Sequence, residues 1–290
     1  MSPVLRFAPS PNGRLHLGHA YSALLNDAVA RRLGGTWLLR IEDIDPVRAS
    51  PENIAGIEHD LGWLGLHWPR PVRRQSQHMD EYRAAADHLR RAGLLYPCRC
   101  TRGEIATAIA AREIATGEPW PRDPDGTPLY SGTCRAVPGA KVEGMLADGA
   151  PLAWRLNMAT ATAAAGPVSW RAFDPDGREW SVDEARPERW GDIVLFRKET
   201  PTSYNLSVVL DDAIQGITHV VRGQDLEAAT DIHALLARLL SLGLPLYHHH
   251  ALLADEHGLK LAKSRSSHSL AAMREAGERP EAIRARLGFA

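Results

Sequence analysis

The opening stretch of the chain constrains its fold more than any other segment. Apolar residues from Val4 to Ala8 predict a short strand, and the SPNG sequence at residues 10–13 predicts a turn directly after it. The chain continues as RLHLGH over residues 14–19, where the pattern predicts the start of a helix. A strand, a tight turn and a helix in this order begin the alternation from which parallel α/β sheets are built.

Two histidines, His16 and His19, flank Leu17 and Gly18 at this predicted helix start. Unpaired backbone N–H groups and the positive end of the helix dipole favour a phosphate group there. Imidazole rings donate hydrogen bonds to phosphate oxygens, and Gly18 lets a flat ring approach the backbone closely. The alternative is a pair of capped, partly buried imidazoles that bind nothing.

Two lysines, Lys260 and Lys263, lie in a KLAKS sequence at residues 260–264. Alone, such a pair is usually part of a solvated surface. A phosphate cradle at one end of the chain and a pair of cations near the other indicate a nucleotide held between them. We therefore predict a nucleotide site that includes His16 and His19.

The strand–helix alternation continues beyond the opening. Gly34-Gly35 ends the first helix, and TWLLRI at residues 36–41 predicts a buried strand that delivers Glu42, Asp43 and Asp45. Ser50-Pro51 predicts the next helix start. We expect a parallel sheet with right-handed crossovers, whose ligands bind at the carboxyl ends of the strands. The fold class is therefore α/β with a Rossmann-like nucleotide-binding core, although the absence of G-x-G-x-x-G excludes an ordinary dinucleotide fold.

The domain organisation follows from changes in this pattern. A helix is predicted over residues 79–91, and Thr101 with Glu104 fits a capping box for another. From about Gly117 the composition shifts to Pro, Gly and Asp, which indicates an inserted subdomain. The predicted parts are a core at 1–96 and 191–245, an insertion at 97–190, and a lysine loop with a short helical C-terminal region at 246–290. Sheet strands are predicted at 192–196, 204–210 and 217–221, followed by a hairpin at 248–253 and 259–262.

The cysteines of the chain, Cys98, Cys100 and Cys134, all lie in one segment. Thiolates suit zinc, and a structural zinc site needs four ligands. Tyr130 is suitably spaced to be the fourth ligand, and a histidine or water is the rival. The alternative is three buried free thiols. The run His248-His249-His250 could also bind a metal, although such a run is more often a strand at a sheet edge.

Four polar side chains, Arg6, Glu42, Tyr204 and Arg222, are predicted at strand ends on one sheet edge. A carboxylate pairs with an ammonium group, and the planar fork of arginine matches a carboxylate. Two arginines and one glutamate therefore suit a dicarboxylic amino acid. The alternative is a set of surface ion pairs, each of which contributes little to stability.

The overall composition limits the partners of the chain. Its formal net charge of −1 provides no global basic field, so contact with RNA must come from a local patch. Three cysteines indicate a reducing compartment. No apolar run reaches the roughly 18 residues of a membrane span, and site residues begin too early for a signal peptide. We expect a cytoplasmic protein with no membrane partner, and we favour a monomer.

In combination, four segments are similar to the catalytic core of class I glutamyl-tRNA synthetases. They are RFAPSPNGRLHLGHA at the start, RIEDID, PTSYNLSVVLDDAIQGITHVVRG and GLKLAKS. HLGH resembles the HIGH element of that class, and KLAKS resembles its KMSKS loop, with Lys263 at the position expected nearest ATP.

This resemblance implies a reaction and a set of site residues. Glutamate would be activated with ATP and Mg²⁺, with His16, Gly18, His19 and Lys263 at the nucleotide and Lys260 assisting. The amino acid would lie among the residues Arg6, Phe7, Ala8, Pro9, Ser10, Glu42, Tyr204 and Arg222. Glu42 would hold the α-ammonium group, and Arg222 would face a carboxylate.

The sequence departs from that class after the lysine loop, because only about 26 residues follow Ser264. A short chain with this core and a C-x-C…Y-x-x-x-C segment resembles the glutamyl-queuosine tRNA(Asp) synthetase family. This implies transfer of glutamate to the queuosine base in the anticodon of tRNA(Asp), and zinc held by Cys98, Cys100, Tyr130 and Cys134. The open alternatives are a truncated glutamyl-tRNA synthetase, a small-molecule ligase or nucleotidyltransferase, and a non-catalytic RNA-binding relative.

Overall fold

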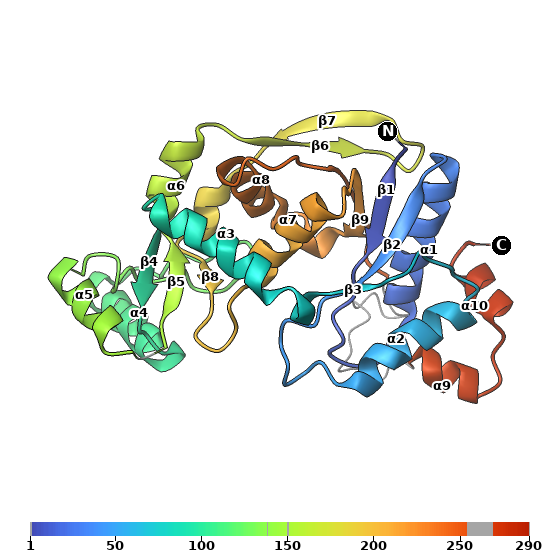
Figure 1. Ribbon diagram of the computed structural model, residues 1–290, viewed down its shortest axis with the longest axis horizontal. Coiled ribbons are helices and arrows are strands. Elements are labelled where there is room, and N and C mark those ends of the chain that lie inside the picture. Colours follow the sequence, from blue (N-terminus) through green and yellow to red (C-terminus); the bar gives the residue numbers. More distant parts are fainter. Residues whose placement is uncertain (1, 138, 150, 254–268, 290) are drawn as a thin grey trace.

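A computed structural model describes residues 2–137, 139–149, 151–253 and 269–289. Figure 1 shows the arrangement of its strands and helices. The strands are β1 Val4–Phe7, β2 Thr36–Ile41, β3 Arg73–Arg74, β4 Leu95–Cys98, β5 Ala153–Leu156, β6 Ser169–Phe173, β7 Glu179–Glu184, β8 Val194–Phe196, β9 His219–Gly223 and β10 Leu246–His250. The helices are α1 Leu17–Arg32, α2 Pro51–Trp63, α3 Met79–Arg91, α4 Arg102–Thr116, α5 Gly139–Ala147, α6 Met158–Ala165, α7 Tyr204–Ile214, α8 Thr230–Leu239, α9 Leu270–Glu275 and α10 Pro280–Arg286, and short 3-10 turns lie at Gln75–Gln77, Pro187–Trp190 and Gln224–Leu226.

The core is a parallel sheet in two adjoining parts. β1, β2 and β3 pair in parallel, and β10 pairs in parallel with both β9 and β6, while β7 is an antiparallel edge strand. β9 lies beside β1, where the backbone N–H of Thr218 donates to the carbonyl of Val4 over 2.9 Å (Figure 1). The predicted α/β fold with a parallel sheet is therefore confirmed.

The core strands are buried on both faces. Leu5 of β1 and Ile41 of β2 are fully buried, and α1 and α2 add Leu24 and Ile57 to the same apolar cluster. Such double burial explains why β2 is an almost continuous apolar run rather than an alternating one. The predicted helix at 79–91 is confirmed as α3.

The capping box before α4 is also confirmed. The Thr101 side chain accepts from the backbone N–H of Glu104 over 3.2 Å, and the Glu104 carboxylate accepts from the backbone N–H of Thr101 over 2.7 Å. This reciprocal pair satisfies two donors that the helix itself leaves unpaired. The first turn of α4 therefore begins where the sequence predicted it.

The prediction of a strand at 204–210 is wrong, because these residues form the first turns of helix α7. Buried residues occur on every side of this helix, which packs between α3 and α8. Its first turns are mostly apolar, and a short apolar segment of a buried helix cannot be told from a buried strand by periodicity. Tyr204 is consequently at a helix start and not at a strand end.

The strand predicted at 192–196 is present as β8, but it does not belong to the parallel sheet. β8 pairs antiparallel with β5, which pairs antiparallel with β4, in a separate small sheet. Conversely, β6 and β7 lie within the predicted insertion at 97–190 and extend the core sheet beside β10. Trp170 and Ala172 of β6 are buried against that sheet, so this part of the predicted insertion packs as part of the core.

The predicted hairpin after residue 248 is only partly visible. Its first strand is β10, which pairs in parallel with β9 and β6. Its second strand, predicted at 259–262, lies outside the described residues. Lys260 and Lys263 lie in the same segment.

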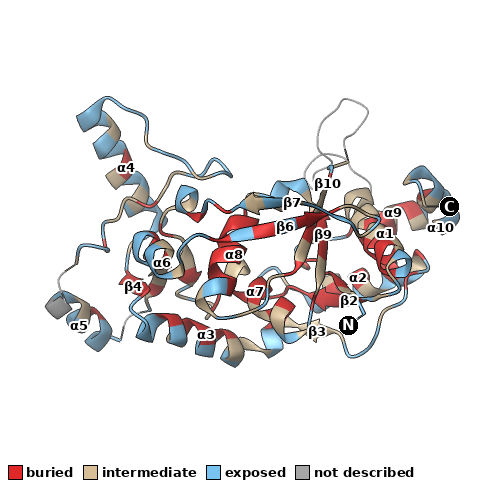
Figure 2. Ribbon diagram, turned by 90° about the horizontal axis from the view of Figure 1, so that it is seen from above, coloured by how far each residue is buried: buried red, intermediate tan, exposed pale blue. Residues whose placement is uncertain are grey.

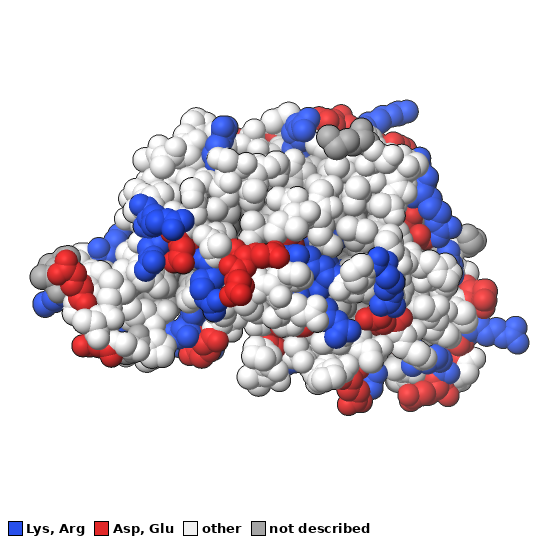
Figure 3. All heavy atoms as spheres, in the orientation of Figure 1, with Lys and Arg blue, Asp and Glu red and all other residues white. Residues whose placement is uncertain are grey.

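The elements differ strongly in how far they are buried. α4 and α5 form a lobe at one end of the molecule, and α4 is mostly exposed, while α8 and β9 are mostly buried (Figures 1 and 2). Basic and acidic side chains are interspersed on the face seen in Figure 3, in agreement with the net charge of −1. Within the described ranges, no helix has the length and apolar character needed to cross a membrane.

Candidate active site

A cavity of about 520 Å³ lies at the carboxyl ends of the parallel strands. β1, β2, β9 and β10 all end beside it. Its lining includes residues that the sequence predicted as a group: Arg6, Phe7, Ala8, Pro9, Ser10, His16, Gly18, His19, Glu42, Tyr204 and Arg222. Segments that lie some 200 residues apart in the chain therefore meet at one site, as expected for an open α/β sheet.

His16 and His19 form the N-terminal cap of α1. The backbone N–H of Gly18 donates to Nδ1 of His16 over 3.1 Å, and the backbone N–H of His16 donates to Nδ1 of His19 over 3.2 Å. Because both Nδ1 atoms are acceptors, the proton of each neutral ring is on Nε2, which makes Nε2 a donor. A Cβ on Gly18 would lie 3.0 Å from Cε1 of His16, so glycine leaves room for this folded-back ring.

Arg222, at the end of β9, is buried and has only neutral partners. Its Nη1 donates to Nδ1 of His233 over 3.2 Å, its Nη2 to the hydroxyl of Thr230 over 2.7 Å, and its Nε to Nε2 of His249 over 3.3 Å. Across the described ranges of the chain, no carboxylate pairs with this guanidinium. A buried cation without a counter-charge is costly, so this arrangement suits an anionic ligand.

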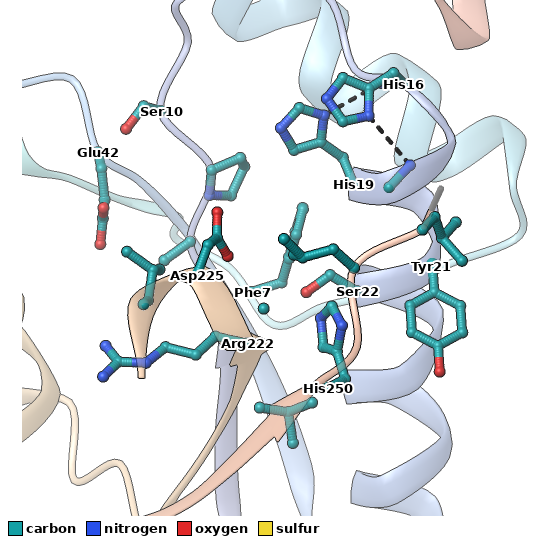
Figure 4. Close-up of a pocket in the computed structure, with 18 of the residues that line it drawn as sticks. Phe7, Ser10, His16, His19, Tyr21, Ser22, Glu42, Arg222, Asp225 and His250 are labelled. Atoms are coloured by element: carbon teal, nitrogen blue, oxygen red, sulfur yellow. Dashed lines mark hydrogen bonds between the residues drawn. The ribbon is translucent and has the colours of Figure 1, made fainter. Parts of the chain in front are cut away.

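The opposite charge lies nearby in Glu42, which directly follows β2 and is 9% exposed. Burial raises the pKa of Glu42 from its ordinary value, and the positive charges of Arg40 and then Arg6 oppose this effect. Figure 4 places Glu42 and Arg222 at one end of the cavity and His16 and His19 at the other. Burial also raises the pKa of the Tyr204 phenol, so this side chain is a neutral hydrogen-bonding group.

The structure adds cavity residues that the sequence reasoning did not single out. They are Tyr21, Ser22, Val221, Gly223, Asp225, Leu226, His250, Leu252 and Leu253. The sequence could have indicated Ser22 as a cavity residue, because Ser22 lies one helical turn after His19 on the same face of α1. Asp43, which the sequence placed beside Glu42, instead accepts hydrogen bonds from the backbone and hydroxyl of Ser76 at 2.8 and 2.7 Å.

The three thiols and the phenol that were predicted as metal ligands lie together beside β4. The sulfur atoms of Cys98, Cys100 and Cys134 are all within 4.8 Å of one another, and the Tyr130 hydroxyl is 3.4 Å from both Cys98 Sγ and Cys100 Sγ. The Arg155 guanidinium lies 3.7 Å from the centre of the Tyr130 ring and donates to Cys98 Sγ over 3.4 Å.

The spacing of these donors fits a tetrahedral zinc ion. Zinc–sulfur bonds of about 2.3 Å in a tetrahedron place the sulfur atoms roughly 3.8 Å apart, and Cys100 Sγ and Cys134 Sγ are 3.4 Å apart. Burial raises the pKa of Cys100 to about 11. Burial also acts against charge on Cys134, but hydrogen bonds, first of all from the Tyr130 hydroxyl, prevail and lower its pKa to about 7.

The three consecutive histidines do not form a metal site of their own. Nδ1 of His248 lies 3.1 Å from the carbonyl of Phe173, while Nε2 of His249 faces Arg222 and the His250 ring packs against Tyr21. Successive residues of a strand point to opposite faces, so neighbouring rings cannot converge on one ion.

The parallel sheet, the histidine cap at the carboxyl end of β1 and the cavity beside it define a class I tRNA synthetase catalytic domain. Residues 4–289 match the family model for class I tRNA synthetases (E and Q), catalytic domain. The chain belongs to this family and is a ligase with ATP as a substrate.

Individual relatives narrow this assignment. The chain is 45% identical to a Rhodobacter capsulatus protein named glutamyl-Q tRNA(Asp) synthetase, over 99% of this chain and 100% of that protein. It is 36% identical to glutamate–tRNA ligase 2 of Nitrosococcus oceani, over 96% of this chain but 57% of that protein. It is also similar to the crystal structure of glutamate–tRNA synthetase from Elizabethkingia anophelis, with a TM-score of 0.79 and 25% identity over 99% of this chain and 61% of that one. The chain thus spans less than two thirds of the last two relatives.

Proposed function

We propose that this chain activates L-glutamate with ATP and transfers it to the queuosine base in the anticodon of tRNA(Asp). The observation that carries the amino-acid assignment is the buried guanidinium of Arg222, which has neutral partners only and lies in the same cavity as Glu42. The name of the Rhodobacter capsulatus relative, which the chain matches over its full length, supports the RNA substrate.

The charges around the cavity suit glutamate. Buried Arg222 and buried Glu42 bring opposite charges to its lining. Both signs are needed for glutamate, which has two carboxylates and one ammonium group at neutral pH. We assign Glu42 to the α-ammonium group and Arg222 to a carboxylate, with Arg6 to Ser10 and Tyr204 as the surrounding pocket.

The nucleotide is assigned to the other end of the cavity. The Nε2 atoms of His16 and His19 are donors at a helix N-terminus, where phosphate oxygens bind well. Gly18 lines the same end of the cavity. Lys260 and Lys263 lie outside the described residues, and we assign them, together with Mg²⁺ bound to the nucleotide, to neutralise the charge on the phosphates.

The chemistry is positioning and charge stabilisation rather than covalent catalysis by the protein. An oxygen of the glutamate α-carboxylate attacks the α-phosphorus of ATP, and the bond to pyrophosphate breaks. A hydroxyl of the queuosine base then attacks the carbonyl carbon of the glutamyl-adenylate, loses its proton, and releases AMP.

We also propose that Cys98, Cys100, Tyr130 and Cys134 hold a structural zinc ion. Three thiols and a phenol within bonding reach of one centre support this assignment. The ion would tie the segment around Cys134 to the end of β4, in a lobe whose exposed helix α4 buries only Ile109. Such sites contribute folding free energy and do not take part in the reaction.

Two assays test the reaction. The first is ATP–pyrophosphate exchange in the presence of each amino acid, and we expect exchange with glutamate alone. The second is charging of tRNA(Asp) with and without queuosine, followed by nuclease cleavage of the charged RNA. Because cleavage separates the anticodon from the acceptor stem, glutamate that stays with the queuosine-containing fragment supports a base acceptor.

The same assays separate the alternatives. Glutamate found on the 3′-terminal fragment would indicate a glutamyl-tRNA synthetase that acts on a 3′ end, and the Nitrosococcus oceani relative is named glutamate–tRNA ligase 2. Turnover without any tRNA would indicate a small-molecule ligase. Failure to exchange pyrophosphate with every amino acid would indicate a non-catalytic RNA-binding relative.

A further inference from the structure

Two buried charged residues, Arg40 of β2 and Asp212 of α7, lie directly behind the cavity without lining it. Nη1 of Arg40 donates to Oδ1 of Asp212 over 2.7 Å, and both side chains are almost completely buried. Each of the two also contacts a residue that lines the cavity. Nη2 of Arg40 donates to Oε1 of Glu42 over 3.2 Å, and Oδ1 of Asp212 accepts from Nε of Arg6 over 3.2 Å.

These contacts form a chain of alternating charge in the order Arg6, Asp212, Arg40, Glu42. Its two ends line the cavity, and its two middle members connect them. Oδ1 of Asp212 accepts from both arginines, so one carboxylate oxygen sets the separation of the β1 and β2 side chains. The ends are therefore held relative to each other by groups that a ligand in the cavity does not touch.

We infer that Arg40 and Asp212 are positioning residues that fix Arg6 and Glu42 in the geometry and charge state needed to bind the amino acid. This inference rests on the proposed function, because it concerns the same cavity. Neither residue belongs to the set that the sequence reasoning assigned to the site. Their role depends on contacts between β2 and a helix some 170 residues later in the chain.

A second layer of contacts keeps this chain rigid. Nε of Arg40 lies 3.7 Å from Oδ2 of Asp211, which is fully buried. Asp211 in turn accepts from Arg73, Gln75 and Tyr82 at 2.8 to 3.0 Å. Buried, paired charges of this kind hold one arrangement, because any displacement leaves a charge without a partner.

The same geometry controls the charge of Glu42. The groups that face it are Arg40 on β2, Arg6 on β1, and Asp212 and Tyr204 on α7. Burial favours the protonated acid, and Arg40 gives the largest opposing effect on the pKa of Glu42. Without Arg40, Glu42 would take up a proton at a higher pH and would lose its attraction for an ammonium group.

Replacing Arg40 and replacing Asp212 should therefore change the KM for glutamate with different dependences on pH. In an Arg40→Met variant, the KM for glutamate should rise at least tenfold at pH 7 and fall again as the pH increases and Glu42 ionises. In an Asp212→Asn variant, the KM should rise at all pH values without this recovery, because Glu42 keeps its contact with Arg40. The KM for ATP should remain within about twofold of wild type in both variants.

The experiment is glutamate-dependent ATP–pyrophosphate exchange from pH 6 to 9 with wild type, Arg40→Met, Arg40→Lys and Asp212→Asn. Arg40→Lys keeps the charge and should restore part of the glutamate KM. Arg189→Met is the matched control, because it breaks an ion pair to a buried carboxylate, Asp231, that does not line the cavity. A melting curve for each variant measures folding separately, and Asp212→Asn tests the inference where Arg40→Met does not fold.

The outcomes separate this inference from the function on which it rests. A wild-type protein that does not exchange with glutamate contradicts the proposed function and the inference with it. A wild-type protein that exchanges, with folded variants whose glutamate KM is unchanged, contradicts the inference alone. So does a parallel rise in the KM for glutamate and ATP with no new pH dependence, since that is the behaviour of a purely structural ion pair.

Discussion

Nη1 of Arg222 donates to Nδ1 of His233 over 3.2 Å, and both side chains are buried. A guanidinium only donates, so Nδ1 of His233 accepts, and the ring proton on Nε2 faces Oδ1 of Asn205 at 3.1 Å. Burial, followed by the positive charge of Arg222, lowers the pKa of His233 well below its ordinary value. The candidate carboxylate-binding arginine is thus held by an imidazole that must stay neutral.

Replacing Arg222 should abolish glutamate recognition without unfolding the protein. Loss of one partner of a buried charge pair typically costs about 2–5 kcal/mol of binding free energy, so Arg222→Met should raise the KM for glutamate by about 30-fold or more. The melting temperature should not fall, because the variant removes a buried charge that lacks a carboxylate partner. Arg222→Lys should recover little, since an ammonium group lacks the planar fork.

The measurement is glutamate-dependent pyrophosphate exchange together with a melting curve. Arg171→Met is the control, because Arg171 is an exposed β6 residue that pairs with Glu179 away from the cavity. An Arg222→Met variant with the wild-type KM for glutamate would contradict the assignment.

The buried histidines should make the protein sensitive to acid. Burial, followed by the charge of Arg222, lowers the pKa of His249 to about 3, and burial also lowers the pKa of His219, His233, His248 and His250. Above about pH 6.5 each of these histidines is neutral in both folded and unfolded chains. As the pH falls below that value, the unfolded chain takes up protons that the folded chain refuses, so the free energy of unfolding decreases.

The proton uptake of one histidine can be measured by replacement. His249→Gln should reduce the slope of unfolding free energy against pH between pH 4 and 6 by about one proton, or about 1.4 kcal/mol per pH unit. Exposed His67 provides the control, because His67→Gln removes an imidazole that is not buried. Equal slopes for wild type and His249→Gln would show that His249 is protonated in the folded protein.

Purified protein should contain about one zinc ion per chain, as expected of a structural site with four ligands. Cys134→Ser should lose the metal and lower the melting temperature, because the ion links two segments of the lobe, while the KM for glutamate stays the same. Tyr130→Phe should release zinc to a chelator faster than wild type. Elemental analysis and chelator kinetics provide the measurements.

Tyr96→Phe is the matched control for the tyrosine, because Tyr96 packs against the same cluster but its hydroxyl donates to Asp192 over 2.6 Å. Equal zinc release from Tyr130→Phe and wild type would remove Tyr130 from the ligand set. A wild-type protein without zinc would leave Cys98, Cys100 and Cys134 as free thiols.

Lys263→Ala should slow glutamyl-adenylate formation at least about 100-fold, equivalent to roughly 2.7 kcal/mol of activation free energy. The reason is the loss of a cation that stabilises the charge developing on the leaving pyrophosphate. Single-turnover adenylate formation measures this rate. Lys198→Ala is the control, because Lys198 is exposed and its ammonium group donates to the carbonyl of Arg99 over 2.6 Å, away from the cavity.

Much of the candidate site could be predicted because its residues occur in short local patterns. His16 and His19 lie on one turn of one helix, and Glu42 directly follows a strand that is mostly apolar. The prediction of strands at 204–210 and in the core sheet at 192–196 was wrong. Short apolar runs permit either a strand or a buried helix, and a strand does not reveal which sheet it joins.

The sequence by itself determined the elements whose signals are local: the strand, turn and helix of the opening, the helix at 79–91, the capping box at Thr101, and the spacing of the cysteines. Tertiary structure alone decided that β6 joins β10, that α7 is a helix, and that Arg40 and Asp212 connect Arg6 with Glu42. The physical reason is that hydrogen bonds within a turn depend on neighbours in the chain. The pairing of buried charges depends instead on which distant segments the apolar core brings together.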